Sequence, residues 1–117
     1  MRLLYAAGVH GHADTFESDI ATHLQYGHVL DTQDYFMMWR MVDLSWPLEI
    51  MRTPEVVKPD SDCAWIWAIS GNYREACGAA MSICPEARWV GYDRRGKPWI
   101  GSISRFMRNM AIGLTIE

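Results

Sequence analysis

The chain has 117 residues, of which 50% are hydrophobic and 21% charged, and its formal net charge at pH 7 is −3. This length allows one domain with its own core, and the balance excludes disordered, collagen-like and low-complexity classes. The longest apolar run, residues 64–69, is far shorter than the roughly 20 residues of a membrane helix. The apolar stretch at the N-terminus is too short for a secretory signal. Three cysteines without CxxC spacing favour reduced thiols, so we expect a single cytoplasmic domain over residues 1–117.

The first predicted element is a helix over residues 15–26. Phe16, Ile20 and Leu24 recur at helical spacing and would form one apolar stripe. A capping-box pattern precedes this stripe, and Gly27 follows it as a residue suited to end a helix in a left-handed conformation.

A hairpin should come next, formed by residues 28–30 and 35–42 around a polar turn. Three prolines in the following stretch exclude a continuous helix or a central strand there. We therefore expect residues 45–62 to be mostly loop, with one helical turn around residues 48–51.

The centre of the sheet is predicted at residues 63–69, because both alternating faces of this segment are apolar. Asn72 would begin a helix over residues 73–83, and Pro85 would end it. A strand over residues 88–93 then completes a strand–helix–strand unit. Its length favours a right-handed crossover and a parallel pair of strands.

The C-terminal region is predicted to turn around residues 94–97, to return through Trp99 and Ile100, and to end in a helix over residues 102–112. That helix would have one apolar face and a basic outer face. Together the elements predict an α+β protein with a central mixed sheet and about three helices.

Between Ala64 and Lys97 the chain has the strand Trp-Ile-Trp-Ala-Ile, a helix, a Cys-Pro stop and the run Arg-Trp-Val-Gly-Tyr-Asp-Arg-Arg-Gly-Lys. This succession resembles the middle of the GNAT acyltransferase fold. It is similar to the core of the toxin-activating lysine acyltransferases and of small GNAT-like proteins of tailed bacteriophages, some of which serve in virion assembly. The resemblance rests on hydrophobic pattern and implies a GNAT-like three-layer core.

The same region departs from the chemistry of that family. GNAT enzymes hold the coenzyme A pyrophosphate with a Gln/Arg-x-x-Gly-x-Gly/Ala loop, where this chain has Ile69-Ser-Gly-Asn-Tyr-Arg74 with one glycine. The toxin-activating branch uses a His and a strand Asp, and no Asp lies within residues 63–69. A scaffold without these residues suggests another use for the fold.

The turn before the second long helix is the candidate anion site. Ser70, Gly71 and Asn72 would offer the free N–H groups of a helix N-terminus, and Arg74 would add a cation. If the chain takes an acyl-CoA, these four residues would hold its phosphates. The alternative is structural, with Asn72 as a helix cap and Gly71 as relief for a turn.

Other candidate groups have ordinary structural interpretations. His23 is the candidate general base if Asp19, one turn earlier, orients it, although the pair also suits a helix surface. His10 and His12 supply two ligands where zinc needs three or four, so no metal is expected. The three cysteines are expected to be small buried hydrophobes, because nothing in the sequence places a base beside them.

Charge is distributed unevenly along the chain. Residues 87–117 hold six basic and two acidic residues, a balance of +4, whereas residues 1–86 hold five basic and twelve acidic residues, a balance of −7. Cations interleaved with aromatic residues suit a single-stranded nucleic acid, an acidic protein or a solvated hairpin tip. The negative net charge disfavours the nucleic acid. The basic residues are Arg88, Arg94, Arg95, Lys97, Arg105 and Arg108.

Six Trp and eight Met are many for so small a core. Trp39 and Trp46 lie where a strand meets a loop, and they either complete the core or form an exposed patch for a partner.

These observations favour a protein without enzymatic activity or cofactor that acts through contact with another protein or with itself. The resemblance implies that it is a phage-encoded virion-assembly accessory or a host-directed factor. The first alternative is an acyl-CoA-dependent N-acyltransferase that uses residues 70–74 with His23 as base. The second is a small nucleic-acid-binding protein that uses the basic C-terminal region.

Overall fold

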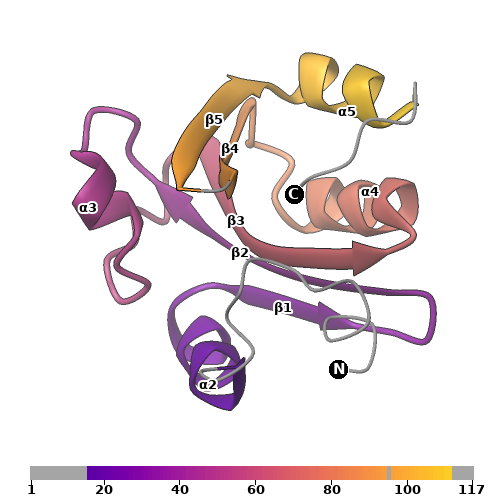
Figure 1. The fold of residues 1–117 in the computed structure, drawn as a ribbon, viewed down its shortest axis with the longest axis horizontal. Helices are drawn as coiled ribbons and strands as arrows, with labels where there is room; N and C mark the ends of the chain where they lie inside the picture. The colour runs from indigo at the N-terminus through magenta and orange to yellow at the C-terminus, as the bar shows by residue number, and fades with distance from the viewer. Residues whose placement is uncertain (1–15, 95, 112–117) are drawn as a thin grey trace.

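The computed structural model describes residues 16–94 and 96–111. Five strands form one sheet in the order β1-β2-β3-β4-β5 (Figure 1). Neighbouring strands are antiparallel except β3 and β4, which are parallel. The elements in chain order are α2 (Phe16–Tyr26), β1 (His28–Asp31), β2 (Tyr35–Val42), α3 (Leu48–Met51), β3 (Cys63–Gly71), α4 (Tyr73–Ile83), β4 (Trp89–Arg94), β5 (Lys97–Ser102) and α5 (Ile103–Ala111).

This architecture confirms the predicted α+β fold with a mixed sheet. The hairpin, the parallel β3–β4 pair and the long helices all occur where the hydrophobic pattern predicts them. The one-turn helix α3 occupies the loop region, at the position where a helical turn was expected. β5 has six residues and pairs with β4 along its whole length, so the return strand is longer than the sequence indicated.

Helices cover both faces of the sheet and make three layers (Figure 1). On one face, α4 and α5 pack against a cluster that includes Trp39 and Ile66. On the other face, α2 packs against Phe36 and Met38, and α3 contributes Met51 to a separate cluster. Successive residues of β2 therefore point alternately into the two apolar layers, as the period of a strand requires.

The centre of β3 is buried on both faces, as its sequence predicts. Trp65 belongs to the cluster at α3, whereas Ile66 belongs to the cluster under α4 and α5. The register between β2 and β3 shifts at Trp67, because Ile66 pairs with Trp39 and Ala68 pairs with the preceding residue of β2. This bulge directs Trp67 and Ala68 toward the α2 side of the sheet.

The face of α2 that packs on the sheet differs from the predicted one. Leu24, which the apolar stripe places inside, is 68% exposed, whereas His23 is fully buried and Asp19 nearly so. The helix has the expected bounds, but the face that packs on the sheet is rotated toward His23. The interpretation of Asp19 and His23 as a surface pair is therefore wrong.

Within the described ranges, no helix has the length and the apolar character needed to cross a membrane.

Candidate functional site

The turn between β3 and α4 holds the four residues of the candidate anion site. Gly71 has a φ of 85°, a left-handed conformation that glycine adopts without strain. The side chain of Asn72 accepts a hydrogen bond from the backbone N–H of Glu75 at 3.1 Å. Asn72 is therefore a helix cap, and it already occupies one of the N–H groups that an anion would need.

The other two residues of this turn point in different directions. Ser70 is fully buried and its Oγ has no hydrogen-bond partner, whereas Arg74 is exposed on α4. The turn thus combines a buried hydroxyl group, a helix cap and an exposed cation. Binding of an anion at this turn stays a prediction.

The candidate base His23 belongs to a buried polar cluster between α2 and the sheet. Its Nδ1 lies 2.8 Å from the backbone carbonyl oxygen of Asp19, and its ring centroid lies 5.3 Å from that of Trp67. Arg40 of β2 is also fully buried, with its guanidinium carbon 5.8 Å from the centroid of the same indole. The Nη1 of Arg40 donates to the carbonyl oxygen of Val56 at 3.3 Å.

Three nitrogens of this cluster have no hydrogen-bond partner among the described residues, namely His23 Nε2, Arg40 Nε and Arg40 Nη2. Burial lowers the pKa of His23, and the charge of Arg40 lowers it further. Burial also lowers the pKa of Arg40 to about 10, against the attraction of Glu55. Near neutral pH, His23 is thus neutral and Arg40 charged. Because the ring of His23 is fully enclosed, its free Nε2 does not reach a substrate.

The structure places a histidine beside one of the cysteines, which the sequence analysis missed. Cys84, at the end of α4, has its Sγ 3.4 Å from the Nε2 of His28 in β1. The imidazole of His28 stacks on the indole of Trp39 with 4.8 Å between centroids. These residues are far apart in the sequence and meet through the packing of three elements, so local spacing carries no signal for them.

The other two cysteines are buried, as expected. Burial raises the pKa of Cys63 to about 12 and that of Cys77 to about 12. Burial also raises the pKa of Cys84, although a hydrogen bond from the Trp39 side chain opposes that effect. Cys84 is therefore the cysteine whose surroundings contain both a base and a hydrogen-bond donor.

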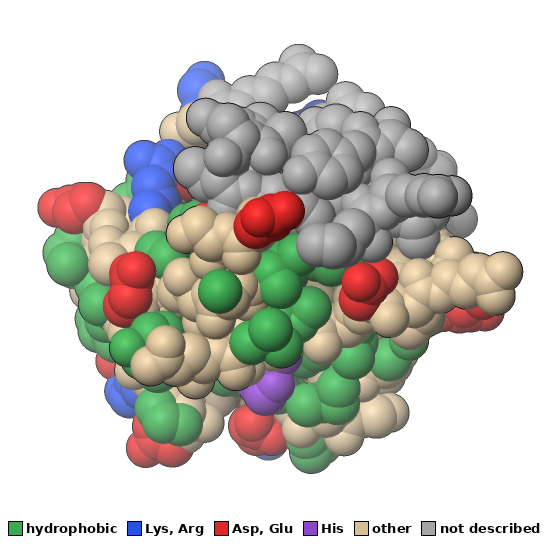
Figure 2. Space-filling model, turned by 90° about the horizontal axis from the view of Figure 1, so that it is seen from below, with side chains coloured by type: hydrophobic (Ala, Val, Ile, Leu, Met, Phe, Trp, Pro, Cys, Tyr) green, Lys and Arg blue, Asp and Glu red, His purple; other side chains and the backbone are tan. Residues whose placement is uncertain are grey.

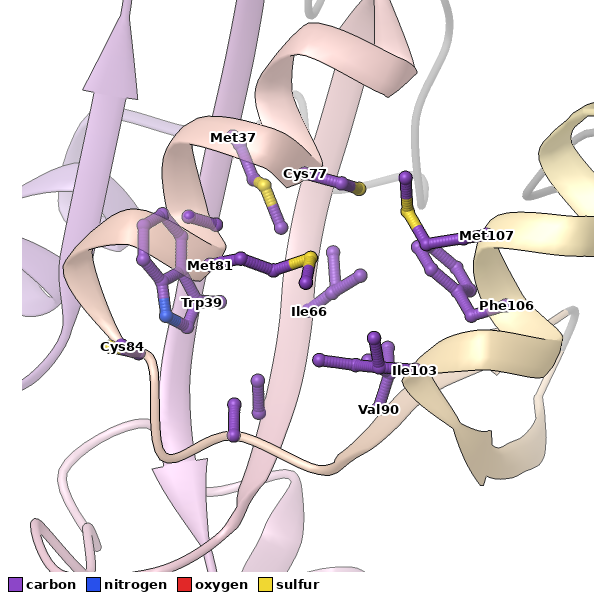
Figure 3. A pocket seen from close by; sticks show the side chains of 13 residues that line it. Met37, Trp39, Ile66, Cys77, Met81, Cys84, Val90, Ile103, Phe106 and Met107 are labelled. Atoms are coloured by element: carbon purple, nitrogen blue, oxygen red, sulfur yellow. The ribbon is translucent and has the colours of Figure 1, made fainter.

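An apolar pocket lies between the sheet and the helices α4 and α5 (Figure 3). Its empty space, including the open mouth, is about 390 Å³, and all of its lining residues are hydrophobic. Figure 3 shows the sulfur atoms of Met37, Cys77, Met81 and Met107 distributed around it. Such a lining suits an apolar group but offers no polar atom to orient a ligand.

The basic residues of the C-terminal region lie on β4, β5 and α5 or directly before β4. The exposed cations are Arg88, Arg94, Lys97, Arg105 and Arg108, which we call the basic surface. Arg95 lies outside the described residues. Two large hydrophobic side chains of β4 and β5, Trp89 at 40% and Ile100 at 39% exposure, lie on the opposite face of the sheet, on the side of Trp65. The guanidinium of Arg105 lies 5.7 Å from the ring centroid of Trp99.

Asp93, the acidic residue of this region that the structure describes, is already paired. Arg52, which follows α3, donates from Nε and Nη2 to the two carboxylate oxygens of Asp93, each at 2.8 Å. A bidentate pair of this kind holds the carboxylate in a fixed geometry. The described part of the β4–β5 hairpin therefore presents cations without a competing carboxylate.

The two candidate contact tryptophans have different environments. Trp39 is fully buried in the cluster under α4 and α5, so its interpretation as part of an exposed patch is wrong. Trp39 lies in the core because it occupies the centre of β2, where it pairs with Ile66. Trp46 is partly buried against the cluster around Met51.

No cluster of three or more His, Cys, Asp or Glu side chains suited to hold a metal ion occurs in the described part of the chain. His10 and His12 lie outside the described residues. A comparison of the chain with protein-family models, curated proteins and solved structures finds no match.

Proposed function

We propose that the protein acts by binding another protein through its basic surface. The observation that carries this proposal is the set of exposed cations on β4, β5 and α5, where Arg105 covers the ring of Trp99 and the one described carboxylate, Asp93, is held by Arg52. Aromatic and arginine side chains contribute most of the binding free energy in protein interfaces. A surface of this composition suits a partner that offers carboxylates around an apolar side chain.

A second copy of the chain satisfies part of that requirement. Residues 1–86 carry a balance of −7, opposite in sign to the +4 of residues 87–117. Opposite charges steer association and raise its rate, most strongly at low ionic strength. Self-association and binding of a different acidic protein are therefore both outcomes of this proposal.

The biological setting of the proposal comes from the resemblance to the GNAT fold. On that basis the protein is a phage-encoded virion-assembly accessory or host-directed factor in the cytoplasm of a bacterial host. The scaffold would then serve for contact instead of acyl transfer.

One observation favours acyl-CoA-dependent N-acyl transfer as the second candidate. β3 and β4 pair only from Cys63 to Ile66 and from Trp89 to Tyr92, so residues 67–71 extend past this pairing toward the start of α4. A ligand bound there would meet the turn of residues 70–74. His23 is enclosed on the opposite side of the sheet and would need to become accessible to act as base.

A small nucleic-acid-binding protein remains the third candidate. The contact between Arg105 and Trp99 favours it, because cations beside aromatic rings bind unpaired bases.

A set of paired variants separates the three candidates. Arg94→Ala/Lys97→Ala removes two cations that lie directly across β4 and β5, and Arg74→Ala is the matched control on α4. We expect wild-type protein and Arg74→Ala to self-associate in sedimentation velocity, or to bind a tryptophan-containing polyglutamate peptide, at low salt. The double variant should lose this association.

Two results would contradict protein binding. Binding of single-stranded DNA in preference to the peptide, with a steep dependence on salt, would favour the nucleic-acid candidate. Stabilisation by acetyl-CoA that Arg74→Ala or Gly71→Asp abolishes would favour acyl transfer.

A further inference from the structure

Three residues from three elements meet at one edge of the sheet. His28 of β1 pairs with Trp39 of β2 across the hairpin, and Cys84 follows the last turn of α4. The thiol sulfur lies 3.4 Å from His28 Nε2, within reach of a hydrogen bond that involves sulfur. The indole of Trp39 stacks on the ring of His28, with 4.8 Å between the centroids. The sulfur thus lies beside a base whose ring packs on the indole.

This group of residues opens into a groove. Cys84, His28 and Glu86 line it together with apolar side chains that include Tyr26, Val57 and Ile83. Its empty space, including the open mouth, is about 830 Å³. Figure 2 views the molecule from below and shows a histidine side chain among hydrophobic ones on that face. His28 is partly exposed.

We propose that Cys84 and His28 form a nucleophile–base pair that accepts an apolar acyl group from an activated carboxylic ester bound in this groove. The proposal is independent of the basic surface and of the turn at residues 70–74. A cysteine becomes a nucleophile when a base within hydrogen-bond reach removes its proton. The spacing of the two side chains meets that requirement, and the mostly apolar groove walls suit an acyl chain.

The step is a transfer of the acyl group to sulfur. With its ring proton on Nδ1, His28 accepts the thiol proton of Cys84 at Nε2 while Sγ attacks the carbonyl carbon of the ester. The S–C bond forms, the bond from the carbonyl carbon to the leaving oxygen breaks, and His28 returns the proton to that oxygen. The products are an S-acyl cysteine and an alcohol.

The environment of the pair keeps both groups neutral before the reaction. Burial raises the pKa of Cys84 and lowers the pKa of His28, and the Glu86 carboxylate opposes the second effect. The C-terminal end of α4 also disfavours a thiolate, because the helix dipole is negative there. A neutral imidazole is the form that can accept a proton, so the pair is suited to general-base catalysis.

The other two cysteines provide internal controls in the same molecule. Cys77 lies on the same helix and Cys63 in the central strand, and both are buried with no histidine of the described segments acting on their thiols. Cys84 is itself only 4% exposed, so simple exposure does not distinguish it strongly from them. A difference in reactivity would therefore report on His28.

The test is acylation of the folded protein by p-nitrophenyl butyrate, followed by peptide mass spectrometry that locates the acyl group on each cysteine. We expect Cys84 to react at least about tenfold faster than Cys63 and Cys77. His28→Gln should reduce the rate at Cys84 at least about tenfold and leave the other two unchanged. Equal rates at all three cysteines, or an unchanged rate in His28→Gln, would overturn the proposal.

A second measurement uses the wild-type protein alone and does not depend on the folding of a variant. When the rate at Cys84 is followed against pH, it should fall as His28 becomes protonated, with an inflection below 6.5, and it should level off above that pH. A rate that instead rises about tenfold per pH unit toward the thiol pKa would show an unassisted thiol and refute the role of His28.

Discussion

The side chains buried on the two faces of the sheet differ in polarity. Under α4 and α5 the buried cluster is formed by hydrophobic residues, and the pocket there has no polar lining. Under α2 and α3 the apolar clusters surround buried polar side chains, including the fully buried His23 and Arg40. A buried polar atom without a partner costs free energy. The buried polar side chains of the second face therefore lower the stability of the fold.

Two arginines on the α3 side of the molecule illustrate that cost. Arg52 uses its Nε and Nη2 to hold Asp93 in a partly exposed pair. Arg40 leaves the same two nitrogens without a partner while fully enclosed. The same side chain therefore forms a bidentate ion pair in one place and a buried, only partly hydrogen-bonded charge in the other.

The largest expected effect comes from neighbouring residues of β2 that point to opposite faces. Trp39→Ala would leave a cavity in the apolar layer and should lower the free energy of unfolding by about 3–5 kcal/mol. Arg40→Met keeps the length of the side chain and removes the unpaired charge, so it should change stability by less than about 1.5 kcal/mol or increase it. Urea denaturation of both variants measures the difference. An equal loss in the two would show that Arg40 stabilises the fold despite its free nitrogens.

A glycine at the β4–β5 hairpin should produce the next largest effect. A Cβ at Gly91 would lie 2.8 Å from a ring carbon of Trp65, closer than real contacts allow. Gly91→Ala should therefore lower the free energy of unfolding by about 1–3 kcal/mol through overpacking. Thermal unfolding followed by circular dichroism measures the loss. A neutral result would mean that the indole of Trp65 moves aside at little cost.

Acid should lower the stability of the fold in part through His23. His23 has a pKa lowered by burial, so it binds a proton less readily in the folded state than in the unfolded state. Its contribution to stability is complete above pH 6.5 and is lost as the pH falls from 6.5 through the lowered pKa of the folded protein. For one histidine the loss is at most about 1.4 kcal/mol per pH unit.

The His23→Gln variant isolates that effect from the same effect at His28, whose pKa burial also lowers. We expect its free energy of unfolding, measured in urea from pH 7.5 to 5.5, to fall less steeply than that of the wild type. A wild type whose stability is constant over this range would contradict the burial of a neutral His23.

The strands and helices were predictable because apolar periodicity is a local property. Residues 63–69 are apolar on both faces, and this pattern alone predicted a central strand. The face of α2 that packs on the sheet was not predictable in the same way. Leu24 fits the apolar stripe by its hydrophobicity, but His23 packs on the sheet instead, beside Trp67 at the bulge of β3. A bulge changes which side chains share a face and leaves no periodic signal.

The candidate sites also differ in how far the sequence predicts them. The cap at Asn72 and the glycine conformation at Gly71 follow from neighbouring residues, so their structural interpretation was available from the sequence. The approach of His28 to Cys84 depends on the edge strand and the end of α4 meeting beside Trp39. Contacts of that kind are tertiary, and no spacing within either segment encodes them.

The cap also allows a test of moderate size. Asn72→Ala removes the acceptor for the N–H of Glu75 and should lower the free energy of unfolding by about 1 kcal/mol. Asn72→Asp keeps an acceptor at this position and should retain most of the stability. Differential scanning calorimetry of both variants, with and without acetyl-CoA, compares the cap with the candidate anion site.

The smallest expected effect is a gain, and it serves as the control for Gly91. Gly78 lies on the exposed face of α4, and a Cβ there would meet no atom within 4 Å. Because glycine inside a helix costs about 0.5–1 kcal/mol relative to alanine, Gly78→Ala should stabilise the protein by that amount. Both substitutions add one methyl group, so opposite signs in thermal unfolding would separate the clash at Gly91 from the gain in helix propensity at Gly78. A loss of stability in Gly78→Ala would show that the added methyl group is not free of contacts on this face of α4.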